Sequence, residues 1–301
     1  MMAKYVPSSL REHYDETITA DAATNLPGFK SRTVNYKLGY WDPRPNGVRY
    51  LKALIYHLAA GLSPENRERL RRIRNRDVGD PISVIYDGEQ VCMDSLLSVL
   101  ELEFLAAGMP LDGLRVLEVG GGYGRTCHAM MSNHELASYA IVDLPRSLEL
   151  SREYLRAVLD DQRFARIRFV TPDEVDALAA DGLDLCLGVN AFAEMPIDTV
   201  RDYLRLADSH SGWFYVRDAV GKYADPGLDG RTPDDQAARM ALRNGVLQDV
   251  LDIHDSEAVR EHSRKFVAAY RPGPGWTCAA DAWAPPWSFF WQALYRADRA
   301  A

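Results

Sequence analysis

Cysteine is scarce in this 301-residue chain, and long hydrophobic runs are missing. The four cysteines lie far apart and include no Cys-x-x-Cys pair, so neither a zinc knuckle nor a disulfide scaffold is expected. No stretch of about 18 consecutive apolar residues occurs, which argues against a membrane span. The start, Met1 to Leu10, lacks the charged-then-apolar layout of a secretory signal. We therefore expect a cytoplasmic protein with no membrane partner.

Positive charge is also in short supply. Lys and Arg number 35 against 43 Asp and Glu, which gives a formal net charge of −8. Because affinity for phosphate backbones comes mainly from clustered positive charge, we expect no nucleic-acid partner. One dense basic run, Arg67 to Arg76, is expected to be a solvated helix face or a subunit contact; the alternative is binding of a phosphorylated acceptor. The oligomeric state stays open, a homodimer included.

Composition is otherwise that of a globular chain, and its apolar pattern changes along the sequence. Apolar residues make up 47% and charged residues 26%, which excludes a disordered or fibrous protein. Up to about residue 110, apolar residues recur at helical spacing, within 48–58 and again within 93–105. We therefore predict a mainly helical N-terminal cap over 1–110, which forms the acceptor region, and a core over 111–301.

Short apolar runs alternate with amphipathic stretches in the second part. Strands that alternate with helices imply right-handed crossovers and a mostly parallel sheet with helices on both faces. A Gly- and Pro-rich irregular stretch lies beyond the fifth run, and we expect a lid over about 219–265. The strands are expected at 115–119, 138–142, 167–170, 183–189, 213–216 and 289–295, the last of them at or near the sheet edge.

A run of glycines stands between the first strand of the core and its helix. Such glycines let the backbone approach a ligand closely. The dinucleotide pattern Gly-x-Gly-x-x-Gly does not fit, because Arg125 or Cys127 stands where its last glycine is required. The pattern that fits is Glu-x-Gly-x-Gly-x-Gly, formed by Glu118, Gly120, Gly122 and Gly124. It resembles the first motif of class I S-adenosylmethionine-dependent methyltransferases, which implies a Rossmann-like core with a mostly parallel seven-stranded sheet.

The chemistry of S-adenosylmethionine (SAM) agrees with this resemblance. SAM has no pyrophosphate, but it carries an ammonium, a carboxylate and a sulfonium. An acid at the tip of the first strand, Glu118, can attract the cationic amino-acid end directly or through water. A second acid after the next strand should accept hydrogen bonds from both ribose hydroxyls, and Asp143 stands there. We therefore predict SAM as cofactor and S-adenosylhomocysteine (SAH) as its product.

Further residues are expected to line this cofactor site. Asn190 stands at the end of the fourth strand, where a turn-capping role is the alternative. Asp173 follows the third strand near the expected adenine, and a helix N-cap is an equal alternative. Tyr123, within the glycine turn, is expected to cover the cofactor or reach the acceptor. The full expected set is Glu118, Gly120, Gly121, Gly122, Tyr123, Gly124, Asp143, Leu144, Asp173, Asn190 and Ala191.

Three segments narrow the resemblance to a bacterial family of sugar O-methyltransferases. They are the run from Asp143 to Pro145, the run from Asn190 to Pro196, and Gly79-Asp80-Pro81 ahead of the core. The likeness covers roughly residues 78–220. It implies O-methylation of a small-molecule hydroxyl, with a sugar or glycoside of a natural-product pathway, antibiotics included, as acceptor.

A sugar hydroxyl is weakly acidic, so its methylation calls for a general base or a metal. Glu194 follows the fourth strand; its alternative role is to cap the next helix. Asp218 follows the fifth strand, where pairing with Arg217 or anchoring of the lid is the alternative. His262 is the third candidate base, and His254 is a weaker one. We expect no metal, because no ordered series of carboxylates stands at the strand ends.

Two questions stay open at this stage. The late tryptophans Trp276, Trp283, Trp287 and Trp291 are expected to pack in the core, with stacking against an acceptor as the alternative. The reaction has alternatives as well: methylation of nitrogen, carbon or a phenol, or a SAM-binding regulatory or scaffold protein without catalysis.

Overall fold

The computed structural model describes residues 8–19, 43–179 and 182–298, and the chain forms two compact units, 1–60 and 61–301. The first unit contains helix α1 (Ser9–Tyr14), the π-helical turn η1 (Asp15–Thr19) and helix α3 (Pro43–Ala60). Residues 1–7 and 20–42 of the predicted cap lie outside the described residues. The unit boundary falls near residue 60, so the later part of the predicted cap belongs to the same unit as the sheet.

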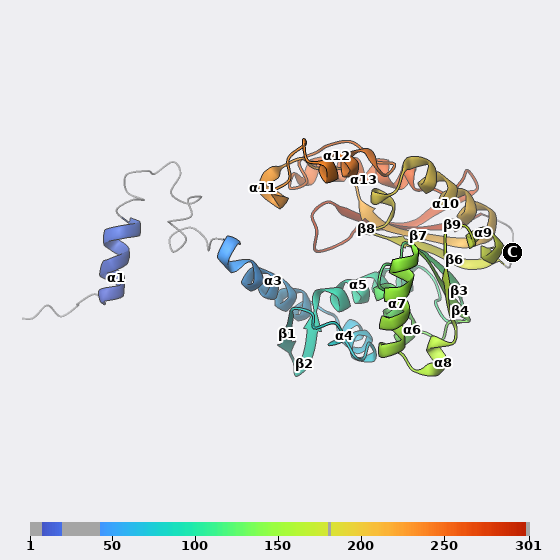
Figure 1. Ribbon diagram of the computed structural model, residues 1–301, viewed down its shortest axis with the longest axis horizontal. Helices are drawn as coiled ribbons and strands as arrows, with labels where there is room; N and C mark the ends of the chain where they lie inside the picture. The colour runs from blue at the N-terminus through green and yellow to red at the C-terminus, as the bar shows by residue number, and fades with distance from the viewer. Residues whose placement is uncertain (1–7, 20–42, 180–181, 299–301) are drawn as a thin grey trace, which may run out of the picture. The chain divides into compact units, whose positions relative to one another are not determined.

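A seven-stranded sheet organises the second unit (Figure 1). Its strand order is β5-β4-β3-β6-β7-β9-β8, and every pairing is parallel except the two made by β9. This confirms the predicted fold class, a Rossmann-like α/β core with a mostly parallel seven-stranded sheet. The strands are β3 (Arg115–Val119), β4 (Ser138–Val142), β5 (Ile167–Val170), β6 (Leu183–Val189), β7 (Ser211–Ala219), β8 (Trp276–Trp283) and β9 (Phe290–Ala297).

The far side of the sheet agrees with the prediction in part. The predicted last strand, β9, lies near the edge as expected, one position in from it, and β7 is longer than expected. The edge strand is β8, which the sequence analysis did not identify as a strand. Its residues alternate between more and less buried positions, as expected for a strand with one face on the core.

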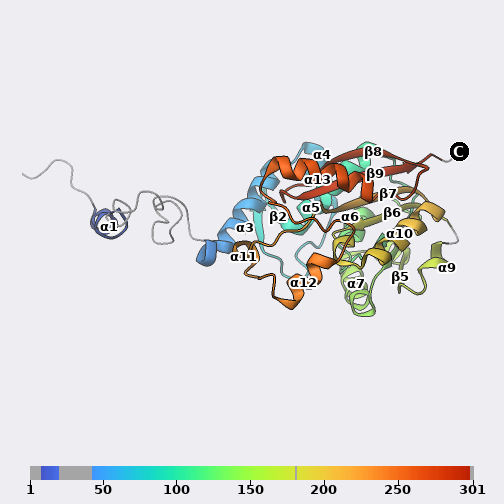
Figure 2. The same cartoon turned by 90° about the horizontal axis from the view of Figure 1, so that it is seen from above.

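Helices cover both faces of the sheet. Figure 1 shows α5 (Met93–Gly108), α6 (Arg125–Asn133) and α7 (Pro145–Val158) on one face. The opposite face carries α9 (Val175–Ala179), α10 (Ile197–His210) and α13 (Ser256–Ala269), and α13 lies along β9 (Figure 1, Figure 2). The short helix α8 (Asp161–Phe164) follows α7. The described residues contain no helix with the length and apolarity needed to cross a membrane.

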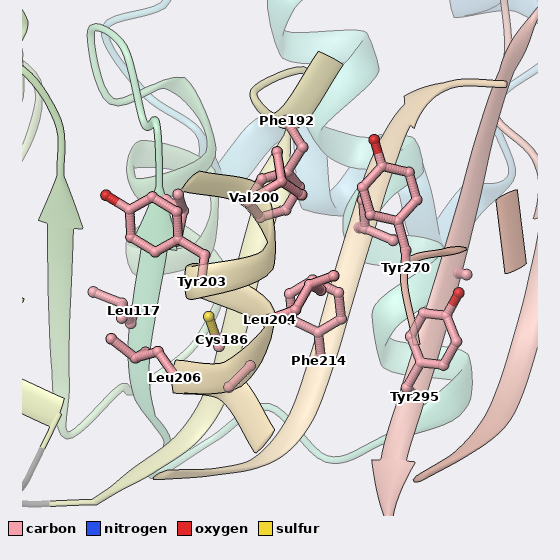
Figure 3. Packing of buried hydrophobic residues seen from close by; sticks show 14 of the residues in the cluster. Leu117, Cys186, Phe192, Val200, Tyr203, Leu204, Leu206, Phe214, Tyr270 and Tyr295 are labelled. Carbon is pink, nitrogen blue, oxygen red and sulfur yellow. The ribbon is translucent and has the colours of Figure 1, made fainter. Parts of the chain in front are cut away.

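A cluster of aromatic and aliphatic side chains fills the space between the sheet and α10 (Figure 3). The ring of Phe192 is fully buried there, with ring centroids 6.1 Å from Phe214 and 5.8 Å from Tyr270. A Cβ on Gly188 would meet the Phe192 ring at 2.4 Å. Glycine in β6 therefore gives Phe192 room to anchor the segment that follows this strand.

The segment before the sheet contains a hairpin besides its helices. Helix α4 (Pro64–Arg72) is followed by a hairpin of β1 (Ser83–Tyr86) and β2 (Glu89–Cys92). Asp87 and Gly88 connect the strands with φ of 49° and 80°, and Asp-Gly is a strong signal for such a turn. The sequence thus contained a signal for the hairpin. It was missed because the apolar residues on both sides of it recur at helical spacing.

The basic run has a structural explanation in part. The guanidinium of Arg76 donates to the carbonyls of Leu70 and Ile73 at 2.6 and 2.5 Å, and it pairs with Glu89 at 2.6 Å. It therefore ties the end of α4 to the hairpin. Arg71 and Arg72 lie on the exposed face of α4 near Glu68, as expected for a solvated helix.

The segment between β7 and α13 contains two short helices, α11 (Pro226–Asp229) and α12 (Gln236–Arg243). A parallel bridge between Lys222 and Val250 joins its two ends. Since α13 buries Val259 and Phe266 in the core cluster, the irregular segment ends near residue 255. We call residues 220–255 the lid segment below; the expected range to 265 extended into a helix that covers the sheet.

Candidate functional site

The strand order reverses beside β3, and both sides of that point carry predicted site residues. β4 lies on one side of β3 and β6 on the other, so the chain leaves their carboxyl ends in opposite directions. Ligands of open α/β sheets bind in the crevice outside such a switch point. Gly120 follows β3 and Ala191 follows β6; a Cβ on Gly120 would lie 2.7 Å from that of Ala191. The turn after β3 and the turn after β6 therefore touch at the switch point.

The glycine turn is tightly packed on its flanks and open in the middle. Gly120, Gly122 and Gly124 all have positive φ, of 69°, 56° and 95°. A Cβ on Gly124 would meet Leu155 of α7 at 2.8 Å, and one on Gly121 would meet Ile141 of β4 at 2.8 Å. A Cβ on Gly122 would meet nothing within 4 Å. The middle of the turn thus presents bare backbone to open space.

Asp143 lies directly beside this open backbone. One carboxylate oxygen accepts a hydrogen bond from the Gly122 amide at 2.8 Å, and the other accepts from Leu144 at 2.7 Å. The Leu144 side chain next to it is 66% exposed. A carboxylate has room for about four hydrogen bonds, so Asp143 retains acceptor capacity for a ligand. The structure therefore brings the glycine turn and Asp143 together.

Glu118 lies beneath the turn rather than in front of it. Its side chain is buried, and it accepts a hydrogen bond from the Tyr139 hydroxyl at 2.8 Å. Burial raises the pKa of Glu118 to about 7, against the lowering effects of Tyr139, Arg125 and Thr126. Side chains alternate along a strand, and Leu117 and Val119 occupy the other face. Glu118 was expected to attract the ligand either directly or through water. Because its side chain is buried, it cannot contact a ligand directly in this conformation.

Tyr123 contacts α5 and α7. Its hydroxyl donates to Asp94 of α5 at 2.8 Å, and its ring lies edge-on to Tyr154 of α7, with centroids 4.9 Å apart. These residues line a cavity of about 280 Å³ that also includes Gly79 and Pro81. Tyr123 is therefore a wall residue of the space between the glycine turn and the segment before β1.

Asn190 is held in place by a buried arginine. It has a positive φ of 56°, a conformation that asparagine tolerates better than most residues. Its side-chain oxygen accepts from Arg217 at 2.6 Å, and its amide donates to the Arg217 carbonyl at 2.8 Å. The expected turn-capping alternative and a cofactor-lining role are both compatible with this position.

The short turn η4 (Phe192–Glu194) after β6 is fixed by contacts from β7 and the lid segment. Asp218 accepts from the Ala193 amide at 2.9 Å, and Lys222 donates to the Ala193 carbonyl at 2.8 Å. Asn244 donates to the Glu194 carbonyl at 2.7 Å. The backbone around Glu194 is therefore set by three side chains that are distant in sequence.

Asp218 is placed as a support for this turn. Its side chain is 2% exposed, and its second oxygen accepts from the Ala219 amide at 2.9 Å. Burial raises the pKa of Asp218 to about 6, opposed by these backbone amides and by Lys222. The sequence analysis named Asp218 as a candidate base, but both of its carboxylate oxygens accept hydrogen bonds from backbone amides.

Glu194 borders a pocket of about 210 Å³ beneath the lid segment. Lys222, Tyr223 and Phe289 form part of its wall, with Tyr223 and Phe289 in edge-on contact at 5.6 Å between ring centroids. Alanine side chains of α12 line the other side. Burial lowers the pKa of Lys222, and the charges of Asp218 and Glu194 oppose this effect. Sequence reasoning missed Lys222, since no local motif marks it.

The remaining candidates lie away from this pocket wall. His262 on α13 has one ring nitrogen 2.8 Å from the Ala258 carbonyl and the other 3.4 Å from Asp249, so local contacts occupy both. Asp173 is exposed, and its hydrogen bond with Thr171 lowers its pKa. His254 lies 3.5 Å from the Ser288 hydroxyl. None of the three lines the pocket that Glu194 borders.

The tryptophans divide between core and surface. Trp276 is buried and donates to Asp208 at 2.7 Å, as expected for core packing. Trp283, the last residue of β8, and Trp287, on the connection to β9, are 48% and 39% exposed, and the Trp283 indole donates to the Trp287 carbonyl. Because β9 runs antiparallel to β7, this connection lies at the carboxyl edge of the sheet. An acceptor-stacking role therefore stays open for these two.

Within 8–19, 43–179 and 182–298, no group of three or more His, Cys, Asp or Glu side chains is arranged to hold a metal ion. Metal independence of the reaction stays a prediction.

Several solved structures have a similar fold. The methyltransferase domain of the bacterial protein CtHen1 shares 11% identity over 66% of this chain and 96% of that one, with a TM-score of 0.46. Magnesium protoporphyrin IX methyltransferase from Synechocystis PCC 6803, which holds SAH, shares 14% over 78% and 95%, with a TM-score of 0.44. The O-methyltransferase NcsB1 of neocarzinostatin biosynthesis, bound to SAM and 2-hydroxy-5-methyl naphthoic acid, shares 20% over 68% and 56%, with a TM-score of 0.41.

These comparisons stop at a general likeness. No family model matches the sequence, and no curated protein matches it. Since the identities and TM-scores are low, we take no functional conclusion from them and infer the function from the site.

Proposed function

We propose that this protein is a SAM-dependent methyltransferase that acts on a small-molecule hydroxyl. The observation that carries the proposal is the contact between Asp143 and the open backbone of Gly122 at the switch point of the sheet. A carboxylate at this position can accept hydrogen bonds from two ribose hydroxyls. The open space beside Gly122 leaves room for the sugar and amino-acid parts of SAM. A dinucleotide pyrophosphate would instead require the glycine spacing that Arg125 breaks.

Several residues of this site would bind SAM. Asp143 would accept from the ribose, and the exposed Leu144 side chain would cover the adjoining apolar surface. Glu118 lies beneath the turn, and above its pKa of about 7 its ionised carboxylate would attract the cationic amino-acid end. When bound, SAM supplies an electrophilic methyl group and leaves as SAH.

Glu194 is the residue that the geometry favours as general base. It borders the lid pocket, where its charge acts on Lys222. It would take the proton of the acceptor hydroxyl as the oxygen bonds to the methyl carbon. Asp218, Lys222 and Asn244 would hold the backbone that aims it, so much of the rate would come from alignment.

The acceptor is proposed to be a sugar or glycoside bound in the lid pocket. The pocket combines three carboxylates, a lysine and the aromatic rings of Tyr223 and Phe289. Hydroxyl-rich rings are bound by such polar groups together with aromatic faces. The family resemblance of the segment from Asn190 to Pro196 supports the same choice.

A binding titration with SAM and SAH, followed by an assay of SAH release with candidate glycosides, tests the proposal. We expect micromolar SAH binding and SAH release that requires an acceptor. Absence of binding to either compound would overturn the proposal. Binding without release for any class of acceptor would favour the non-catalytic alternative, and product NMR would separate O- from N- or C-methylation.

A further inference from the structure

A buried carboxylate on α5 lies between the buried Arg217 and the partly buried Arg125. Glu101 is 2% exposed, and its two oxygens each accept from the guanidinium of Arg125 at 2.9 Å. One of these oxygens also lies 3.5 Å from Nε of Arg217, whose side chain is equally buried. Nothing in the function described above uses this glutamate.

The contact of Glu101 with Arg125, the first arm of the cluster, leads to the glycine turn. Arg125 is the first residue of α6 and follows Gly124 directly. Besides the two bonds to Glu101, it donates to the Ser98 hydroxyl at 2.9 Å. A guanidinium that makes two parallel hydrogen bonds to one carboxylate has a fixed position, and so has the residue that carries it. Here that residue is Arg125, which follows the last glycine of the turn.

The second arm leads to the turn after β6. Arg217 donates to the Asn190 side chain at 2.6 Å and to the Pro285 carbonyl at 3.5 Å, and its guanidinium lies 4.9 Å from the Phe290 ring centroid. Asn190 stands immediately before Ala191, which touches the glycine turn. The two arms therefore reach the two turns that meet at the switch point.

We propose that Glu101 is a positioning residue that fixes both walls of the cofactor crevice, holding Arg125 on the β3 side and, through Arg217, Asn190 on the β6 side. This inference rests on the proposed function. Removal of one partner from a buried charge cluster leaves uncompensated charge, so the arginines should shift once the carboxylate is neutralised. The two walls are predicted to lose their relative position, and cofactor affinity should fall although Glu101 does not touch the ligand.

The test measures SAH affinity by calorimetry in a double-mutant cycle. We expect E101Q to weaken SAH binding about tenfold, and the N190A substitution about fivefold in the otherwise unaltered chain. In the E101Q background, N190A should cost less than about twofold, because Asn190 has already lost its fixed support. The matched control is E103Q, which neutralises an exposed glutamate on the same helix and should leave SAH affinity unchanged.

The outcomes of the cycle decide whether Glu101 positions Asn190. Equal factors for N190A in both backgrounds would overturn the link, even if E101Q lowers the melting temperature. If circular dichroism shows that E101Q is unfolded, R217K replaces it in the cycle, since lysine keeps the charge but cannot bridge Glu101 and Asn190. Failure of the unaltered protein to bind SAH would overturn the proposed function itself, whereas binding with additive effects would overturn the role of Glu101 alone.

Discussion

The two halves of the candidate site are held by different kinds of contact. On the β3–β4 side, the glycine turn and Asp143 are joined by backbone amides, and the elements involved lie within about 30 residues of one another. On the β6–β7 side, the backbone of Ala193 and Glu194 is fixed by Asp218, Lys222 and Asn244 from distant parts of the chain. The first half should therefore persist when the lid segment is disturbed, and the second should not.

The glycine turn offers the sharpest contrast within the first half. G120A should lower the free energy of unfolding by about 3 kcal/mol, because its Cβ would lie 2.7 Å from that of Ala191 and its φ is positive. G122A should cost only about 1 kcal/mol, since its Cβ meets nothing, yet it should weaken SAH binding by occupying open space. Urea unfolding with SAH titration measures both. Equal stability of the two variants would contradict the described packing.

Asp143 should carry the largest share of cofactor affinity. D143A is expected to weaken SAH binding about 100-fold, because two charge-assisted hydrogen bonds to the ribose would be lost. D173A removes an exposed acid after the neighbouring strand β5 and should change affinity less than about twofold. Calorimetry with both variants decides between them. A larger loss with D173A would move the nucleoside away from β4.

Burial of Glu118 predicts a dependence of stability on pH. Its folded pKa of about 7 lies above the ordinary value of 4.5, so the folded state retains a proton that the unfolded state has lost. The free energy of unfolding should therefore fall as pH rises from about 4.5 to 7 and level off above that range. In E118Q this loss should shrink by about 2 kcal/mol, measured by chemical unfolding between pH 5 and 8. Identical pH profiles would show that Glu118 is not buried in its protonated form.

The lid-side half is tested by Lys222. K222M should reduce methyl transfer about tenfold, since the Ala193 carbonyl loses its donor and the aim of Glu194 loosens. SAH affinity should stay within about twofold, because the glycine turn is held independently of the lid. K265M is a matched control, since Lys265 pairs with Asp249 on the exposed side of α13. Loss of SAH affinity in K222M would contradict the separation of the two halves.

The same difference explains what the sequence could predict. The strand, the glycines and Asp143 follow one another closely, so periodicity and spacing were enough to predict them. Strand alternation beside Leu117 and Val119 places Glu118 on the other face of β3, which the predicted helices also cover, and the hairpin at Asp87-Gly88 had a local signal. Both features had a signal in the sequence. The first was missed because Glu118 was expected to contact the ligand, and the second because the surrounding pattern is helical.

The contacts of the other half had no comparable signal. Lys222 reaches Ala193 across 29 residues, and Asn244 reaches Glu194 across 50, so only the folded chain brings them together. Asp218 was recognised as a residue at the strand end, but its orientation depends on the Ala193 amide, which sequence does not place. His262 was assigned to the lid because the beginning of α13 could not be told from the irregular stretch before it.

A crystal structure of the protein with SAH is the most direct test of the central claim. We expect both ribose hydroxyls within about 3.2 Å of the Asp143 carboxylate, and the homocysteine part over Gly122. SAH bound at another edge of the sheet, or a ribose that makes no contact with Asp143, would contradict the account.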